Sequence, residues 1–416
     1  SPIAWAAKSV TPSLRPSSGF RADSLNRITL MNHHDPARRM LLRQSIALAG
    51  AAALGGTAGS TWAAAVTDAP SSDPHPVLGR TLTRIGFGSC ANEGKAQPIW
   101  DAILARHSDL FVFLGDNIYG DTRDMAVLRA KYAQFAAQPG FSRLRATTPI
   151  VAVWDDHDFG ENDAGGDYPM KEETRRMFLD FWDEPAGSPR RDRDGVYASY
   201  VFGPPGRRVQ VILPDLRYNR TPLLKLDLGG ADYETWARAR LAAGLQVPGP
   251  YARNPDLKAT MLGERQWQWL ERQFEVPADV RLIGSSLQVL ADFTGWEAWA
   301  NFPRDQQRLI DLIRRKNANG VVFLSGDIHY AELSKLDVNV PYTLWDLTSS
   351  GLTEEWTIPT PNANRVGEVL PEANFGFIDI DWQGPSTRFT LGIVDAKGRT
   401  RMSSDIELAS LAGRQT

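Results

Sequence analysis

Four segments of this chain place thiol, carboxylate, phenol and imidazole groups directly after short runs of apolar residues. They read GSC at 88–90, GDNIYGD at 115–121, DDHDFGEND at 155–163 and SGDIHYAE at 325–332. Carboxylates held a few ångströms apart repel one another and raise each other's pKa, and a divalent or trivalent cation commonly relieves this repulsion. The four segments therefore predict a metal site, provided that the fold brings them together.

The apolar runs ahead of these segments have the length and continuity of strands that are covered on both faces. We predict such strands at the following positions: 83–88, 110–114, 150–154, 208–214, 280–285 and 320–324. Periodic patterns between and after them predict helices at 125–137, 171–182, 233–243, 263–274 and 305–316. Ligands of open α/β sheets bind at the carboxyl ends of the strands, so all four segments are expected at one sheet edge.

The donor types indicate which ions would suit such a site. Cys90, the only cysteine of the chain, is in isolation better explained as a small buried filler. A single Asp or His at a strand end, such as His157 or His329, is likewise more often a cap or turn residue. Four strand ends together favour a metal. Thiolate, phenolate and imidazole suit Fe³⁺, whereas oxygen ligands suit Ca²⁺ or Mg²⁺, so we expect Fe³⁺ plus Ca²⁺, with Zn²⁺, Mn²⁺ or Mg²⁺ as alternatives.

The order of these motifs resembles a known family. GD-x-x-(D/Y), then (N/D)-H-(D/E), then G-(H/D)-x-H is the pattern of calcineurin-like metallophosphoesterases. The spellings FGSC, GDNIY, WDDHDFGEND and SGDIHY resemble its alkaline phosphatase D (PhoD-like) branch, over about residues 82–350. The resemblance implies an α/β (α+β) fold with a two-sheet β-sandwich core flanked by helices, and an active site at the carboxyl ends of the strands.

The same resemblance implies metal ligands. Cys90 and Tyr119 would bind one metal, and Asp116 would bridge it to a neighbouring ion. Asp156, directly before His157, stands where the wider superfamily has a ligand asparagine. The full set of implied ligands is Cys90, Asp116, Tyr119, Asp156, Asp327 and His329.

Three further residues are candidates for catalysis and substrate binding. By resemblance, His157 would be a general acid or phosphate donor rather than a ligand, and Asn162 would contact metal or phosphate. Arg217, in the segment DLRYNR, would face the pocket, where a guanidinium matches two phosphate oxygens. A structural pair of Asp215 with Arg217 is the alternative. Gln288 could orient a ligand or water, or be structural.

The first 65 residues have the composition of an export leader. Arg38 and Arg39 precede an apolar run at 46–54, and three alanines at 63–65 suit cleavage, as in a twin-arginine signal. An ordinary secretory signal or a membrane anchor is the alternative. We expect a leader at 1–65, a linker at 66–80 and a single catalytic domain at 81–416 that ends in a β-hairpin. The mature chain would lack a transmembrane span and be periplasmic or secreted through the twin-arginine export machinery.

These observations favour an exported phosphoesterase that acts by attack of metal-activated water on phosphomonoesters, phosphodiesters or both, with a small-molecule or lipid substrate. The alternatives are a phospholipase D-type phosphodiesterase and a non-catalytic exported metal- or phosphate-binding protein. The net charge of −3, without a long Lys/Arg run after the leader, argues against a nucleic-acid-specific surface. A serine hydrolase is disfavoured because the GSS at 284–286 lacks the G-x-S-x-G elbow.

Overall fold

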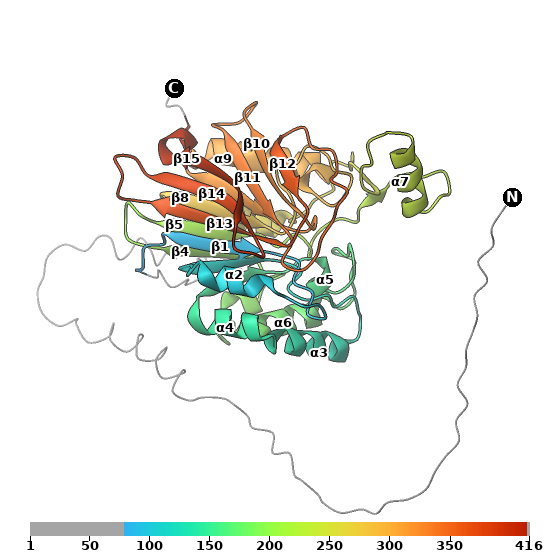
Figure 1. The fold of residues 1–416 in the computed structure, drawn as a ribbon, viewed down its shortest axis with the longest axis horizontal. Helices are drawn as coiled ribbons and strands as arrows, with labels where there is room; N and C mark the ends of the chain where they lie inside the picture. The colour runs from blue at the N-terminus through green and yellow to red at the C-terminus, as the bar shows by residue number, and fades with distance from the viewer. Residues whose placement is uncertain (1–78, 414–416) are drawn as a thin grey trace, which may run out of the picture. The chain divides into compact units, whose positions relative to one another are not determined.

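The computed structural model of this chain describes residues 79–413, in which two mixed β-sheets face each other with helices on their outer sides (Figure 1). The first sheet has the order β15-β14-β13-β1-β2-β3, in which β1, β2 and β3 are parallel and β13 is antiparallel to β1. Its strands are β1 (Arg84–Gly88), β2 (Leu110–Leu114), β3 (Ile150–Val153), β13 (Asn374–Asp381), β14 (Arg388–Asp395) and β15 (Thr400–Glu407).

The second sheet has the order β12-β10-β11-β9-β8-β5-β4. Its central strands β5, β8, β9 and β11 are parallel, and β4, β10 and β12 pair antiparallel at the two sides. The strands are β4 (Ala198–Phe202), β5 (Val209–Leu213), β8 (Val280–Ser285), β9 (Val321–Ser325), β10 (Ala331–Leu336), β11 (Leu344–Ser349) and β12 (Arg365–Leu370). A separate two-stranded sheet joins β6 (Leu224–Lys225) to β7 (Tyr251–Ala252).

Most helices pack beside the sheets, whereas α7 projects away from them (Figure 1). Figure 1 shows α2, α3, α4 and α6 grouped together beside β1, and α7 extending away from both sheets. The helices are α2 (Ile99–Ala105), α3 (Met125–Ala136), α4 (Pro139–Thr147), α5 (Asp156–Phe159), α6 (Lys171–Phe181), α7 (Tyr233–Ala242), α8 (Glu264–Gln273) and α9 (Pro303–Arg315). None of the helices within residues 79–413 is long and apolar enough to cross a membrane.

The core between the sheets explains why β2 and β3 are apolar throughout. All five residues of β2, LFVFL, are buried. Gly284 on β8 has no side chain because a Cβ there would lie 2.8 Å from Leu114 of the facing sheet and 2.6 Å from Leu213 of its own. This close packing fixes one sheet against the other, so the carboxyl ends of both parallel regions are held in place relative to each other.

The predicted two-sheet core with flanking helices is confirmed, and so is the C-terminal hairpin, formed by β14 and β15. Six strands, β4, β6, β7, β10, β11 and β12, and the helices α2, α4 and α5 were not predicted. The predicted leader at 1–65 and nearly all of the linker at 66–80 lie outside the described residues, and the single catalytic domain at 81–416 stays a prediction.

Candidate metal centre

The carboxyl ends of β1, β2, β9 and β11 bring thiol, carboxylate and hydroxyl groups into contact. Cys90, after β1, is buried, and its Sγ lies 3.4 Å from Oδ2 of Asp116, which follows β2. The same sulfur lies 3.2 Å from Oγ of Ser350, after β11, and 3.9 Å from the carbonyl oxygen of Asp327, after β9. The predicted convergence of strand ends is therefore present in the structure.

Three groups of candidate ligands share Asp116, and one of them joins it to Asp156 and His157. In the first, here called the thiol group, the ligand atoms of Cys90, Asp116 and His329 all lie within 4.8 Å of one another. The second, called the carboxylate group, meets the same criterion, and it comprises Asp116, Asp155, Asp156 and Asp327. A carboxylate common to both groups is placed as a bridging ligand would be.

Tyr119 stands at the side of the thiol group. Its hydroxyl lies 3.1 Å from Nε2 of His329, and its ring centroid lies 4.1 Å from that of His157. Its backbone N–H donates to Glu93, whose other carboxylate oxygen pairs with Lys131 at 2.6 Å. The phenol is thus fixed beside the atoms with which it would share a metal.

Electrostatics of both groups favour a cation. Burial, reinforced by neighbouring carboxylates, raises the pKa of Cys90, Asp116 and Asp327 well above their usual values. Burial likewise raises the pKa of Asp155 to about 6. Among the described residues, the buried Oδ2 of Asp155 has no hydrogen-bond partner. A bound cation would supply the missing partner and the missing positive charge, so these residues fit a metal centre.

The backbone at these positions is itself unusual. Cys90, Asp116, Asp327 and His329 have φ angles of 64°, 49°, 72° and 61°. Residues with a side chain adopt this left-handed region at a cost of roughly 1–3 kcal/mol each, and such strain concentrates at functional sites. Four of the six predicted ligands therefore occupy a backbone region that is uncommon for residues other than glycine.

His157 is held by a carboxylate that was not among the predicted site residues. Its Nδ1 lies 2.8 Å from one oxygen of Asp121, and its backbone N–H donates to Asp116 at 3.4 Å. Burial lowers the pKa of His157, but the charges of Asp156, Asp116 and Asp121 outweigh burial and raise it to about 11. Without a bound cation, the neighbouring carboxylates therefore favour the protonated imidazole.

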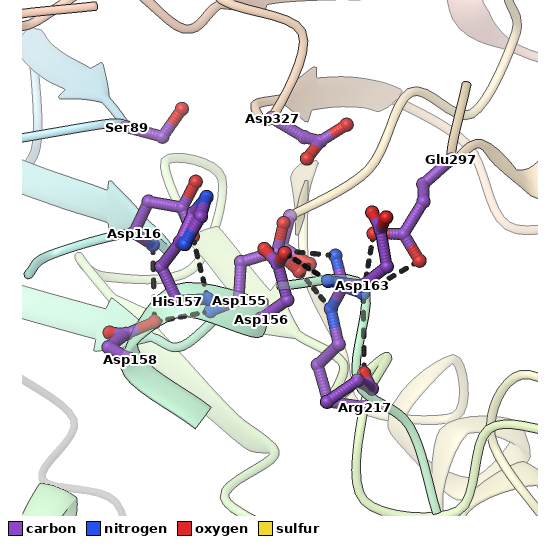
Figure 2. Close-up of polar contacts among 12 residues, drawn as sticks. Ser89, Asp116, Asp155, Asp156, His157, Asp158, Asp163, Arg217, Glu297 and Asp327 are labelled. Atoms are coloured by element: carbon purple, nitrogen blue, oxygen red, sulfur yellow. Dashed lines mark hydrogen bonds and ion pairs between the residues drawn. The ribbon is translucent and has the colours of Figure 1, made fainter. Parts of the chain in front are cut away.

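Asp158 aligns the ends of β2 and β3. Its carboxylate accepts the backbone N–H groups of Asp155 at 2.7 Å, Asp116 at 3.2 Å and Asn117 at 3.4 Å, as the dashed lines to Asp155 and Asp116 in Figure 2 indicate. Burial raises its pKa to about 7 even though these hydrogen bonds oppose that shift. One side chain thus ties together two strand ends that carry candidate ligands.

Arg217 reaches the site, but its guanidinium is directed at carboxylates. It is fully buried, with Nε 2.5 Å from Asp155 and Nη1 2.6 Å from Glu297, while Nη2 lies 3.5 Å from Asp156 (Figure 2). Asp215, the partner in the alternative interpretation, instead accepts the backbone N–H of Arg217 at 2.9 Å. The side chain neutralises the acidic cluster, and its contact with phosphate stays a prediction.

A third cluster of acids is already neutralised by protein. Carboxylate oxygens of Asp156, Asp163 and Glu297 also lie within 4.8 Å of one another. Arg217 and Arg220 both form ion pairs with Glu297. Two guanidinium groups therefore supply positive charge to this cluster, and Arg217 also pairs with Asp155 and Asp156 of the carboxylate group.

Asn162 and Gln288 belong to none of the candidate ligand groups. Asn162 is exposed and lines a cavity of about 420 Å³ together with Asp163, Arg220 and Tyr251. Gln288 donates to Glu332 at 2.6 Å within a buried network of the second sheet, which supports its structural interpretation. Asn162 therefore has access to solvent and ligand, and its contact with metal or phosphate stays a prediction.

Sequence reasoning missed three acids that build the site. Asp121 and Asp155 lay within the motifs already singled out, and their positions beside other candidate ligands were the available signal. Glu297 lies in the stretch TGWEAWA, where a single acid among aromatic and small residues signals a buried carboxylate in need of a partner. The partner is Arg217, 80 positions earlier in the chain.

Two facing mixed sheets, with Cys, Asp, Tyr and His gathered at their strand ends, define a metallophosphoesterase-like fold. Residues 85–371 match the family described as PhoD-like phosphatase, and the chain belongs to that family. Alkaline phosphatase D of Bacillus subtilis (strain 168) is 26% identical over 253 residues, 52% of this chain and 37% of that protein, so the match spans little more than a third of this relative. A solved structure titled "Structure of PhoD" shares the fold, with a TM-score of 0.60 and 15% identity over 83% of this chain and 73% of that chain.

Proposed function

We propose that this protein is a metal-dependent phosphoesterase that hydrolyses phosphomonoesters, phosphodiesters or both. The observation that carries the proposal is that Asp116 belongs to both the thiol group and the carboxylate group. Within each group, the ligand atoms lie within 4.8 Å of one another. Adjacent cation positions joined by one carboxylate suit a phosphoryl group, because its oxygens can contact both positions.

The residues divide into two ligand sets. Cys90, Tyr119 and His329 would hold an Fe³⁺-like ion, and Asp155, Asp156 and Asp327 would hold a Ca²⁺-like ion, with Asp116 common to both; Zn²⁺, Mn²⁺ or Mg²⁺ are the alternatives. When bound, such ions neutralise phosphoryl oxygens and bring the pKa of water close to neutral.

The protein's own contribution is proton transfer and positioning. Because Asp121 holds Nδ1 of His157, the other ring nitrogen, Nε2, is free to donate a proton to the oxygen that leaves phosphorus. Asp121 belongs to neither ligand set, so its carboxylate would stay beside the imidazole when the ions are bound. Arg217 keeps Asp155 and Glu297 in position from within the cluster, and Asn162 would contact the substrate at the rim of its cavity.

The test combines metal analysis with hydrolysis of two substrates on one sample. The protein as purified is expected to contain bound metal and to hydrolyse 4-nitrophenyl phosphate, bis(4-nitrophenyl) phosphate or both, with activity lost on chelation and restored by metal. The relative rates on these two substrates also test the phosphodiesterase alternative. Bound metal without turnover of either substrate would overturn the proposal in favour of a non-catalytic metal-binding protein.

We also propose that the chain is exported to the periplasm or secreted by the twin-arginine route, with a phosphoester outside the cytoplasm as its substrate. The support is the sequence pattern of Arg38 and Arg39 ahead of an apolar run. Replacing both arginines with lysine should leave the protein inside the cell. Continued export of that variant would contradict the twin-arginine route.

A further inference from the structure

An apolar pocket of about 390 Å³ lies between α7 and the segment that follows β11. We propose that it binds the apolar alcohol part of the substrate, so that the preferred esters are phosphates of long-chain alkyl alcohols. This inference rests on the proposed phosphoesterase function and adds a substrate class to it. The residues that carry it are Tyr233, Leu241, Val247, Trp296, Trp356 and Ile358.

Three aromatic rings form one wall of the pocket. The ring of Trp296 lies 5.1 Å from that of Tyr233 and 5.9 Å from that of Trp356, both in edge-to-face arrangements. Tyr233 donates its hydroxyl to the carbonyl of Pro248 at 3.1 Å, so its polar atom is satisfied and its ring is left for apolar contact. Mutual packing of this kind makes a rigid surface that is suited to an apolar ligand.

Both tryptophans of the pocket lie next to residues of the candidate site. The backbone N–H of Trp356 donates to the carbonyl oxygen of His329 at 2.8 Å, and His329 belongs to the thiol group. Trp296 directly precedes Glu297, whose carboxylate lies 2.6 Å from Arg217. In this proposal, an ester whose phosphate sits at the metal centre extends its alcohol part towards the aromatic wall.

The exposure of apolar side chains around the pocket is the second support. Leu241 on α7 is 55% exposed and Ile358 is 37% exposed, while α7 itself projects from the rest of the structure (Figure 1). At the rim, Glu234 and Arg238 pair with each other at 2.6 Å. Because the guanidinium of Arg238 is already paired with Glu234, the pocket favours an alkyl group over a phosphate. The phosphate would then bind at the metal centre.

The experiment measures kcat/KM of the metal-loaded protein for methyl, butyl and octyl phosphate. We expect kcat/KM to rise by about threefold for each methylene that becomes buried. Leu241→Ser and Trp356→Ala should each lower the ratio of octyl to methyl phosphate by about tenfold. Leu245→Ser is the matched control, because Leu245 is 52% exposed in the same segment but lies outside the pocket lining, and it should keep the wild-type ratio.

A flat chain-length profile, or an unchanged ratio in both pocket variants, would overturn the inference. If no ester is hydrolysed, the proposed function fails. The pocket is then tested separately by calorimetry, which measures the affinities of octylphosphonate and methylphosphonate. Tighter binding of octylphosphonate that Leu241→Ser abolishes would support the pocket, and equal affinities would overturn it. A flat profile with dimerisation that depends on Leu241 would assign the surface to a second copy of this chain.

Discussion

Asp121 binds His157 with both carboxylate oxygens, which lie 2.8 Å and 2.9 Å from Nδ1 of the imidazole. A carboxylate in this position fixes the ring orientation and keeps the proton on Nδ1, so that Nε2 is directed at whatever occupies the metal centre. Asp121 itself has a left-handed φ of 44°, which places its side chain beside the histidine from the loop after β2.

Asp121→Asn should lower kcat by about 10-fold to 100-fold for an alkyl phosphate, since the orientation and charge that support the proton donor are weakened. The loss should be small for 4-nitrophenyl phosphate, whose leaving oxygen needs little protonation. Measuring kcat for both esters separates proton donation from a structural role. An equal loss on both substrates would show that Asp121 acts on the site as a whole.

His157→Ala should reduce kcat for alkyl phosphates by about 100-fold or more, because the proton donor is removed. Metal content should stay close to that of the wild type, since the proposed ligands remain. The two measurements, turnover and metal analysis, are made on the same preparation. Loss of metal together with activity would identify His157 as a ligand and would sink its assignment as a general acid.

Cys90→Ser should release the Fe³⁺-like ion and any charge-transfer absorption that arises from it, because an alcohol is a far weaker anionic donor than a thiol. The Ca²⁺-like ion should be retained, since the carboxylate group does not include Cys90. Asp155→Asn is the converse control and should weaken the Ca²⁺-like ion instead. A Cys90→Ser variant that keeps both the ion and its colour would exclude the thiolate as a ligand.

The elements of the fold that could be predicted are those whose local hydrophobic pattern matches the burial of their residues. The strands β2 and β3 are continuous apolar runs, and β14 and β15 alternate around a turn, so both patterns are visible without tertiary information. In contrast, β10 reads AELSKL, and its buried Glu332 is satisfied by distant partners, Arg365 on β12 at 2.5 Å and Gln288 at 2.6 Å. Such a long-range partner is not visible in a local sequence pattern.

The candidate site shows the same limit. Strand ends pointed to Asp116 and His329 because a polar residue after a buried strand is a local signal. The choice between Asp155 and Asp156 was not local, since Ser286 and Arg217, both distant in the chain, decide how Asp155 is oriented. Resemblance to the family supplied the roles, but the positioning contacts depend on the tertiary structure of this chain.

Arg217→Lys should lower the free energy of unfolding by about 3–5 kcal/mol, because an ammonium group cannot bridge Asp155 and Glu297 and leaves buried carboxylates without a partner. Urea unfolding measures the effect. Arg143→Lys is the control, since its pair with Asp101 is exposed, and it should change stability by less than about 0.5 kcal/mol. Unchanged stability with a tenfold rise in KM would instead place the guanidinium against the substrate.

Asp109 provides a prediction of pH dependence far from the metal centre. Its carboxylate accepts hydrogen bonds from the backbone N–H of Thr83 at 2.8 Å and of Arg84 at 3.0 Å, and it pairs with Arg80. Although partial burial opposes ionisation, these hydrogen bonds and the Arg80 charge lower the pKa of Asp109 below its usual value. A carboxylate whose folded-state pKa is lowered stabilises the protein above its unfolded pKa of about 3.9.

Asp109→Asn should therefore cost about 1–2 kcal/mol of unfolding free energy at pH 7. The difference from wild type should shrink as the pH falls from about 4 through the lower folded-state pKa, because the wild-type carboxylate then becomes protonated as well. Urea unfolding of both proteins at pH 7, 4 and 3 measures the trend. Asp101→Asn is the control, since that carboxylate is 81% exposed and should give a small difference at every pH. A gap between wild type and Asp109→Asn that stays constant from pH 7 to pH 3 would show that its cost comes from lost packing rather than from lost charge.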